Sequence, residues 1–180
     1  FLSGKIATPP PLRPPWSVAE YRFVELCTSC GDCTVACTEG LLRLGDDKRP
    51  KVDFRKGGKD GCTFCGDCAA ACPSGAITGL NKLAERPAPW HLRIDINSNC
   101  LAYRGIECRS CGDRCSPDAL LFRPRAGGVS IPEIDAETCT GCGACFGACP
   151  VGAINISSLD DPAAKSCDPS SGARQPIWSS

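Results

Sequence analysis

The sequence predicts an α+β fold that consists of two small modules in tandem, with loose tails at the N- and C-terminal ends. The first observation is a repeated cysteine pattern: of the 17 cysteines among the 180 residues, all except Cys167 fall into four groups. The second is that short β-like runs precede three of the groups, and a small or turn residue followed by apolar residues comes after each group. Each repeat therefore indicates a strand, a cysteine loop, a short helix and a second strand.

Composition divides the chain into five segments. In order, they are a proline-rich arm at residues 1–19, a module with cysteine groups one and two at 20–80, a linker at 81–92, a module with groups three and four at 93–156, and a flexible tail at 157–180. The arm has two interpretations: a disordered tail, or an element that docks a partner through Trp16. Cys167, in the C-terminal tail, is expected to be a free thiol without a ligand role.

Groups one, two and four share the spacing C-x2-C-x2-C-x3-C, and group three departs from it. In group three, Gly105 stands where the first cysteine is expected, and glycine has no side chain to ligate iron. Cys100 and Cys139 each follow a short Ile-Asp run, so we assign Cys100 to the first ligand position, with an insertion in the loop after it. The alternative, a buried or free thiol at Cys100 and an incomplete third site, stays open. The candidate metal ligands are Cys27, Cys30, Cys33, Cys37, Cys62, Cys65, Cys68, Cys72, Cys100, Cys108, Cys111, Cys115, Cys139, Cys142, Cys145 and Cys149.

This spacing is typical of cubane 4Fe-4S clusters, in which each of four iron corners takes one thiolate. Cysteines three residues apart on a curling loop reach three corners from one short segment. Structural zinc usually takes two separated C-x2-C pairs per ion, and three or four cysteines in each of four loops exceed that number. A disulfide framework does not need a repeated C-x2-C-x2-C, and such close neighbours would form strained bridges. We therefore expect three clusters from groups one, two and four, and a fourth if Cys100 is a ligand.

The last cysteine of each group is expected to serve the other cluster of its module, as it does in two-cluster ferredoxins. Pro73 and Pro150 follow that cysteine, as is typical of those proteins, whereas Thr38 and Ser116 depart from the pattern. The exchange predicts four ligand sets, here called sites I to IV. Site I comprises Cys27, Cys30, Cys33 and Cys72; site II Cys37, Cys62, Cys65 and Cys68; site III Cys100, Cys108, Cys111 and Cys149; and site IV Cys115, Cys139, Cys142 and Cys145.

The rest of the sequence argues against several other classes of function. Twenty basic and twenty acidic residues balance, which argues against a nucleic-acid partner attracted by bulk charge. No apolar run approaches the length of a membrane span. With His91 as the only histidine, a Ser/His/Asp arrangement lacks support, and we expect no enzyme but an electron-transfer or assembly protein. Basic residues around group three could dock an acidic partner, although a solvated face is the commoner explanation; they are Arg104, Arg109, Arg114, Arg123 and Arg125.

Two stretches are more specific than the cysteine groups. One is residues 12–40, which begin Leu12-Arg13-Pro14-Pro15-Trp16 and continue into group one; the other is the irregular group three, from Cys100-Leu101-Ala102-Tyr103 to Leu121-Phe122-Arg123-Pro124. Both resemble the NapF family, the ferredoxin-type iron–sulfur proteins of periplasmic nitrate reductase systems. The resemblance covers about residues 12–156 and leaves out the C-terminal tail.

The resemblance implies a cytoplasmic protein that acts on the molybdenum-containing catalytic subunit of periplasmic nitrate reductase before that subunit is exported. The implied role is maturation, by assembly or reduction of that subunit's iron–sulfur cluster. The residues alone support only a multi-cluster redox protein. A soluble electron carrier that feeds a reductase is therefore the alternative, and an iron–sulfur sensor is a third class without a DNA-binding element to support it.

Overall fold

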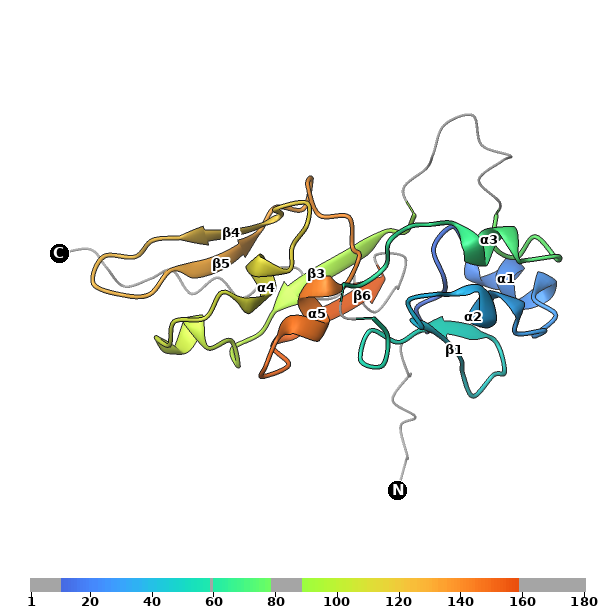
Figure 1. The fold of residues 1–180 in the computed structure, drawn as a ribbon, viewed down its shortest axis with the longest axis horizontal. Helices are drawn as coiled ribbons and strands as arrows, with labels where there is room; N and C mark the ends of the chain where they lie inside the picture. The colour runs from blue at the N-terminus through green and yellow to red at the C-terminus, as the bar shows by residue number, and fades with distance from the viewer. Residues whose placement is uncertain (1–10, 59, 79–88, 159–180) are drawn as a thin grey trace, which may run out of the picture.

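The computed structural model describes residues 11–58, 60–78 and 89–158, which form two lobes along one long axis (Figure 1). We call them the N-terminal module, residues 11–78, and the C-terminal module, residues 89–158. The N-terminal module contains α1 (Glu20–Leu26), α2 (Asp32–Ala36), β1 (Leu42–Leu44), β2 (Pro50–Val52) and α3 (Asp67–Ala70). The C-terminal module contains β3 (Leu92–Ile96), the 3-10 turn η2 (Ala102–Arg104), α4 (Ser110–Asp113), β4 (Leu120–Arg123), β5 (Ile131–Ile134), α5 (Ala144–Ala148) and β6 (Ile154–Ser158).

The C-terminal module is built from two similar halves. Its first strand pairs with its last: β3 runs antiparallel to β6, from Leu92 opposite Ser158 to Ile96 opposite Ile154. The two middle strands, β4 and β5, form a second antiparallel pair, and α4 packs against α5. Each half therefore supplies a strand, a cysteine loop, a short helix and a strand, as the repeats predict. The strand pair β3–β6 extends to Ser158, so Ser157 and Ser158 belong to the module and not to the predicted tail.

The N-terminal module follows the same plan with a different first strand. β1 pairs with β2 in the middle position, and α2 packs against α3. In place of an outer strand pair, Ser17 forms a single antiparallel bridge to Ile77. The Val18 amide donates to the Ala76 carbonyl at 3.0 Å, and the Thr78 amide donates to the Trp16 carbonyl at 2.9 Å. The segment before α1 thus occupies the position that β3 holds in the C-terminal module.

This position corrects the predicted loose arm at residues 1–19, whose described part is folded. Trp16 is only 9% exposed and packs in the core with Phe23, Leu42 and Ile77. The Val52 amide also donates to the Leu12 carbonyl at 2.7 Å. Prolines favour an extended backbone that needs no internal hydrogen bonds, so a proline-rich segment can lie along a module as well as project from it. Residues 1–10 lie outside the described part of the chain.

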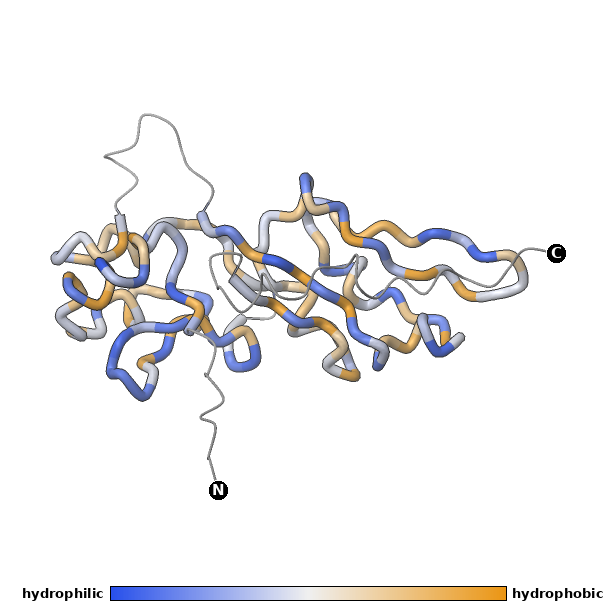
Figure 2. Tube along the Cα trace, turned by 180° about the vertical axis from the view of Figure 1, so that it is seen from behind, coloured by the Kyte–Doolittle hydropathy of each residue, from blue (hydrophilic) through white to orange (hydrophobic). Residues whose placement is uncertain are grey.

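Apolar residues are spread through both modules and do not form one large core. Figure 2 shows hydrophobic and hydrophilic stretches interleaved along the whole molecule. The core cluster of the N-terminal module itself includes Cys33 and Cys68, together with the small side chains Ala69 and Ala76. A core of this kind buries little apolar area, and small domains with such cores usually need additional cross-links or metals. Among the described residues, no helix has both the length and the apolar content to cross a membrane.

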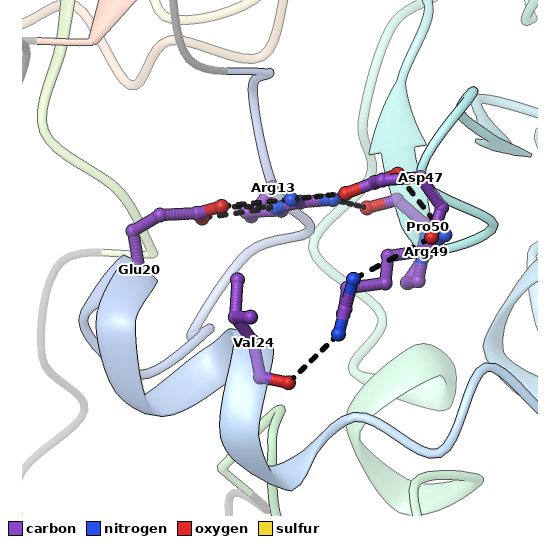
Figure 3. A network of polar contacts seen from close by, with 6 residues as sticks. All are labelled: Arg13, Glu20, Val24, Asp47, Arg49 and Pro50. Atoms are coloured by element: carbon purple, nitrogen blue, oxygen red, sulfur yellow. Dashed lines mark hydrogen bonds and ion pairs between the residues drawn. The ribbon is translucent and has the colours of Figure 1, made fainter.

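Arg13 fastens the N-terminal segment to its module (Figure 3). Its guanidinium donates to Glu20 at 2.7 and 2.9 Å, to Asp47 at 2.7 Å and to the Pro50 carbonyl at 3.1 Å. The same group stands 4.8 Å from the ring centroid of Phe23. Arg13 is 9% exposed, and hydrogen bonds and charge hold the pKa of Asp47 below its ordinary value, chiefly through Arg13. Five donors in a planar fork suit this set of acceptors, which a lysine could not match.

Replacing Arg13 with Ala should lower the free energy of unfolding of the N-terminal module by about 2 kcal/mol. The Pro50 carbonyl loses its buried donor and Phe23 loses its cover. The carboxylates of Glu20 and Asp47 are partly exposed, so they regain water and the loss stays below that of a fully buried pair. Anaerobic denaturant unfolding measures the change. The matched control is Arg123→Ala, whose ion pair with Glu133 is exposed and should change stability by less than about 0.5 kcal/mol. An equal decrease in the free energy of unfolding of the two variants would show that the Arg13 contacts stabilise the module no more than an exposed ion pair does.

Candidate metal centres

Four cavities in the described part of the chain are each lined by four cysteines. Their membership is that of the four predicted ligand sets, sites I, II, III and IV. The cavities are similar in size, at about 300, 420, 340 and 380 Å³ for sites I to IV including their open mouths. The structure therefore brings together all sixteen cysteines that sequence analysis selected, in four equivalent places.

The short helices cause the exchange of the last cysteine between the two sites of a module. In group one, Cys33 lies within α2 and faces site I, whereas Cys37 is the C-cap of α2 and lines site II. In group four, Cys145 lies within α5 and faces site IV, and Cys149 at its C-cap lines site III. Residues four apart on a helix lie slightly more than one turn, about 6 Å, apart along its axis, so the two thiols reach different cavities. We propose the sixteen cysteines as the ligands on the strength of this placement.

Cys100 lies in site III with Cys108, Cys111 and Cys149. The inserted loop is compact: the Arg104 amide donates to the Cys100 carbonyl at 3.3 Å, and the Ile106 amide donates to the Leu101 carbonyl at 2.9 Å. These bonds close the loop through η2, so that the chain returns to the cavity at Cys108. The longer loop thus leaves Cys100 at the cavity, where Leu101 also lines the wall. The placement supports a complete third site, against the alternative of an isolated thiol at Cys100.

Burial is the main influence on the most enclosed thiols. Burial, supplemented by the charges of neighbouring cysteines, raises their pKa values to about 11 for Cys33, Cys62 and Cys111, and to about 12 for Cys68 and Cys145. Cys72 differs: burial opposes ionisation there too, but hydrogen bonds from the Ile77 amide and Ser74 lower its pKa below the ordinary value. Because iron binds the thiolate, cluster binding has to displace the protons that the buried thiols hold at neutral pH.

Backbone amides also reach the crossing cysteines. The Ile77 amide lies 3.5 Å from the sulfur of Cys72, and the Ala153 amide lies 3.1 Å from the sulfur of Cys149. Both donors follow the glycine turn of their group, Ile77 two residues after Gly75 and Ala153 directly after Gly152. Hydrogen bonds to a ligand sulfur stabilise negative charge on it and raise the reduction potential of an iron–sulfur cluster.

The chemistry of the cavities fits 4Fe-4S clusters. Each offers four soft thiol donors, and apolar side chains supply much of the remaining wall, such as Phe23 and Ile77 at site I and Ile94 and Ile134 at site IV. Within the described ranges, no three His, Cys, Asp or Glu side chains are gathered closely enough to hold one metal ion. A cubane places each thiolate on a different iron, so its four sulfurs stand farther apart than the ligands of a single ion.

Two further residues belong to site II that the cysteine pattern does not predict. Trp90, assigned to the linker, and Phe64, between two cysteines, both line this cavity, and their rings meet edge to face at a centroid distance of 5.8 Å. The Trp90 indole N–H donates to the Thr140 carbonyl at 3.2 Å. A tryptophan after two prolines was the only signal for this role. His91, next to it, is exposed, and Cys167 lies outside the described residues.

Several of the predicted docking arginines have intramolecular contacts. Arg114 pairs with Asp60 at 2.9 Å, Arg123 pairs with Glu133 at 3.1 Å, and Arg109 stands 4.7 Å from the ring centroid of Phe122. Arg104 donates to the Asn99 side chain at 2.9 Å. These contacts are exposed, and exposed ion pairs of this kind contribute little to stability, so a partner could replace them.

Comparison with known proteins identifies both modules. Residues 26–77 and residues 104–153 each match a family described as a 4Fe-4S dicluster domain. The second match begins after Cys100, so that residue lies outside it. With the four cysteine cavities, these domains show that the chain binds multiple 4Fe-4S clusters.

Three similar proteins are described as ferredoxin-type. The chain is 43% identical over 148 residues to the ferredoxin-type protein NapF of Haemophilus influenzae, a match that covers 82% of this chain and 80% of that protein. It is 40% identical to NapF of Escherichia coli K12 over 82% of this chain and 85% of that protein. It is 31% identical to the methylamine utilization ferredoxin-type protein MauM of Methylobacillus flagellatus, over 93% of this chain and 76% of that protein.

Proposed function

Because this chain belongs to the NapF family of ferredoxin-type proteins, we propose that it acts in the maturation of the catalytic subunit of a periplasmic nitrate reductase. In this role it assembles or reduces the iron–sulfur cluster of that subunit before export. The subunit is then still in the cytoplasm, which is where we place this protein. It acts as an electron-transfer or assembly protein, without catalytic turnover of its own.

The observation that carries the proposal is the complete set of four cysteines in each of four cavities. When bound there, 4Fe-4S clusters supply one-electron transfer. The chain's own residues hold the thiolates, cover them with apolar side chains and donate amide hydrogen bonds to Cys72 and Cys149. Four such sites in a small protein suit repeated one-electron transfer to a larger partner, which both assembly and reduction of a cluster require.

A plain electron carrier is the second candidate, and the burial of Trp16 favours it. Recognition of an immature partner needs a docking surface beyond the cluster sites, and Trp16 was the anchor expected for it. Since Trp16 is part of the core, a docking role is left to residues 1–10 and to the basic residues near Cys108. The similarity to MauM proteins, whose name refers to methylamine utilization, also suggests that one scaffold serves more than one redox system.

Cells that lack this protein should make the nitrate reductase catalytic subunit in normal amount but with low activity. The reason is that the subunit is exported or retained with an incomplete cluster, while its synthesis is unaffected. Immunoblots and activity assays of the subunit measure the two quantities, and the Cys167→Ser variant should restore activity as well as the wild-type chain does. Normal activity without the protein would favour the carrier.

A pull-down from cells arrested before export supplies the second readout. The maturation role predicts a stable complex with the unexported subunit, whereas a carrier makes weak, salt-sensitive contacts with finished redox partners. The arm should be tested by deletion of residues 1–10 alone. A deletion of residues 1–16 would also remove Arg13 and Trp16 and so unfold the N-terminal module. Recovery of membrane electron-transfer subunits only would point to the carrier.

A further inference from the structure

The two modules meet at a direct backbone contact between two cysteine loops. The Cys62 amide donates to the Cys142 carbonyl at 2.8 Å. Cys62 lines site II of the N-terminal module, and Cys142 lines site IV of the C-terminal module. One hydrogen bond therefore separates the backbone of a site II cysteine from the backbone of a site IV cysteine.

Two glycines allow this close approach. Gly61 has a φ of +74°, and a Cβ there would lie 2.5 Å from the Cys142 carbonyl oxygen and 2.6 Å from the Ala144 amide nitrogen. Across the contact, Gly143 has a φ of +82°, and a Cβ there would overlap the ring of Phe54. Both glycines are needed for their conformation and for the space that they leave. The contact is thus specific to these loops and is not a general surface contact.

A continuous row of aromatic rings covers the contact. Phe54 and Phe64, from the N-terminal module, both meet the ring of Trp90, at centroid distances of 6.0 and 5.8 Å. Phe54 also meets Phe146 of α5 at 6.2 Å. Phe54 is 9% exposed, so the row is partly shielded from water. Apolar cover holds the two loops together and lowers the local dielectric around them.

The same contact sets the order of the four sites. Within the N-terminal module, α2 links Cys33 of site I to Cys37 of site II. Within the C-terminal module, α5 links Cys145 of site IV to Cys149 of site III. The Cys62–Cys142 hydrogen bond connects site II to site IV. The sites therefore lie in the series I, II, IV, III, with sites I and III at the two ends.

We propose that the Cys62–Cys142 hydrogen bond is an electron-transfer junction that joins the two dicluster modules into one four-site series, with Gly61 as its positioning residue. An electron held at site II moves to site IV, so site II is oxidised by one electron and site IV is reduced by one. No proton moves and no covalent bond changes. The inference rests on the proposed redox function and adds to it that electrons cross the molecule from one end to the other.

The test compares Gly61→Ala with Gly75→Ala in the full chain loaded with clusters. Gly75 has a φ of +72°, close to that of Gly61, but a Cβ there meets nothing within 4 Å. Both variants thus carry the same backbone strain, and only Gly61→Ala forces the loops apart. We expect both variants to keep the iron and sulfide content of the wild type. After reduction with dithionite, we expect the electron paramagnetic resonance lines of Gly61→Ala alone to lose the broadening that comes from spins in different modules. Identical electron paramagnetic resonance spectra for wild type and Gly61→Ala would overturn the junction.

A second preparation isolates the inner pair of sites. Replacing Cys27, Cys30, Cys108 and Cys111 with Ala removes ligands from sites I and III and leaves sites II and IV complete. We expect interacting spins from this protein and independent spins once Gly61→Ala is added; independent spins in both would overturn the proposal. If this preparation does not fold, the comparison of Gly61→Ala with Gly75→Ala in the full chain decides. The spin measurement needs no nitrate reductase. If sites II and IV interact but the protein does not support maturation in cells, the result therefore counts against the proposed function and not against the junction.

Discussion

Removal of the clusters should unfold both modules. The core of the N-terminal module contains Cys33 and Cys68 themselves, with only a few large apolar side chains such as Phe23 and Ile77 around them. Metal binding in comparable small domains contributes on the order of 10 kcal/mol to folding. Since the whole net stability of a domain is about 5–15 kcal/mol, loss of the clusters leaves little to hold the fold.

The measurement is amide hydrogen exchange and near-ultraviolet circular dichroism before and after anaerobic chelation. We expect fast exchange throughout the described strands of the apo protein, no cooperative thermal transition, and recovery of both signals when iron and sulfide are returned. The recovery is the control for irreversible damage by the chelator. A cooperative transition of the apo protein at an unchanged temperature would contradict a cluster-dependent fold.

Replacing Cys100 with Ser should remove about one of about four clusters per chain, because each cubane takes four thiolates. Site III would keep Cys108, Cys111 and Cys149, which is one thiolate too few. Iron and acid-labile sulfide, measured on anaerobically prepared protein, should both fall by about one quarter. The inserted loop should survive, since its closing hydrogen bonds use the backbone of residues 100–106.

The matched control for this loss is Cys167→Ser, which alters a cysteine that belongs to none of the four predicted ligand sets and should leave the iron content unchanged. Unchanged iron in Cys100→Ser would mean that Cys100 is no ligand and that the chain carries three clusters. Stoichiometric zinc without sulfide in the wild-type protein would contradict the iron–sulfur assignment altogether.

The local chemistry of the cysteine sites is encoded in the spacing of residues close together in the chain. A spacing of three residues places thiols on one curling loop, and a spacing of four along a short helix sends the last thiol to the neighbouring site. The pattern of two-cluster ferredoxins was enough to predict, without coordinates, that Cys33 and Cys37 line different sites, and the structure places them in two cavities. Cys100, although it stands five residues before the expected position, could also be assigned to the first ligand position of group three, because the Ile-Asp run before it repeats the run before Cys139.

The roles of the proline-rich segment, of Trp90 in the linker and of the contact between the modules became visible only in the folded chain. Trp16 packs with Ile77, Arg13 binds Asp47, and Cys62 meets Cys142, all pairs that lie far apart in the chain. Such contacts depend on side-chain packing across the molecule, which short-range spacing does not encode. A proline-rich segment has few backbone N–H donors to satisfy whether it is free or packed, so its composition does not distinguish the two states. For this reason the composition of residues 1–19 favoured a disordered tail or a docking arm, whereas Arg13 and Trp16 pack against the N-terminal module in the structure.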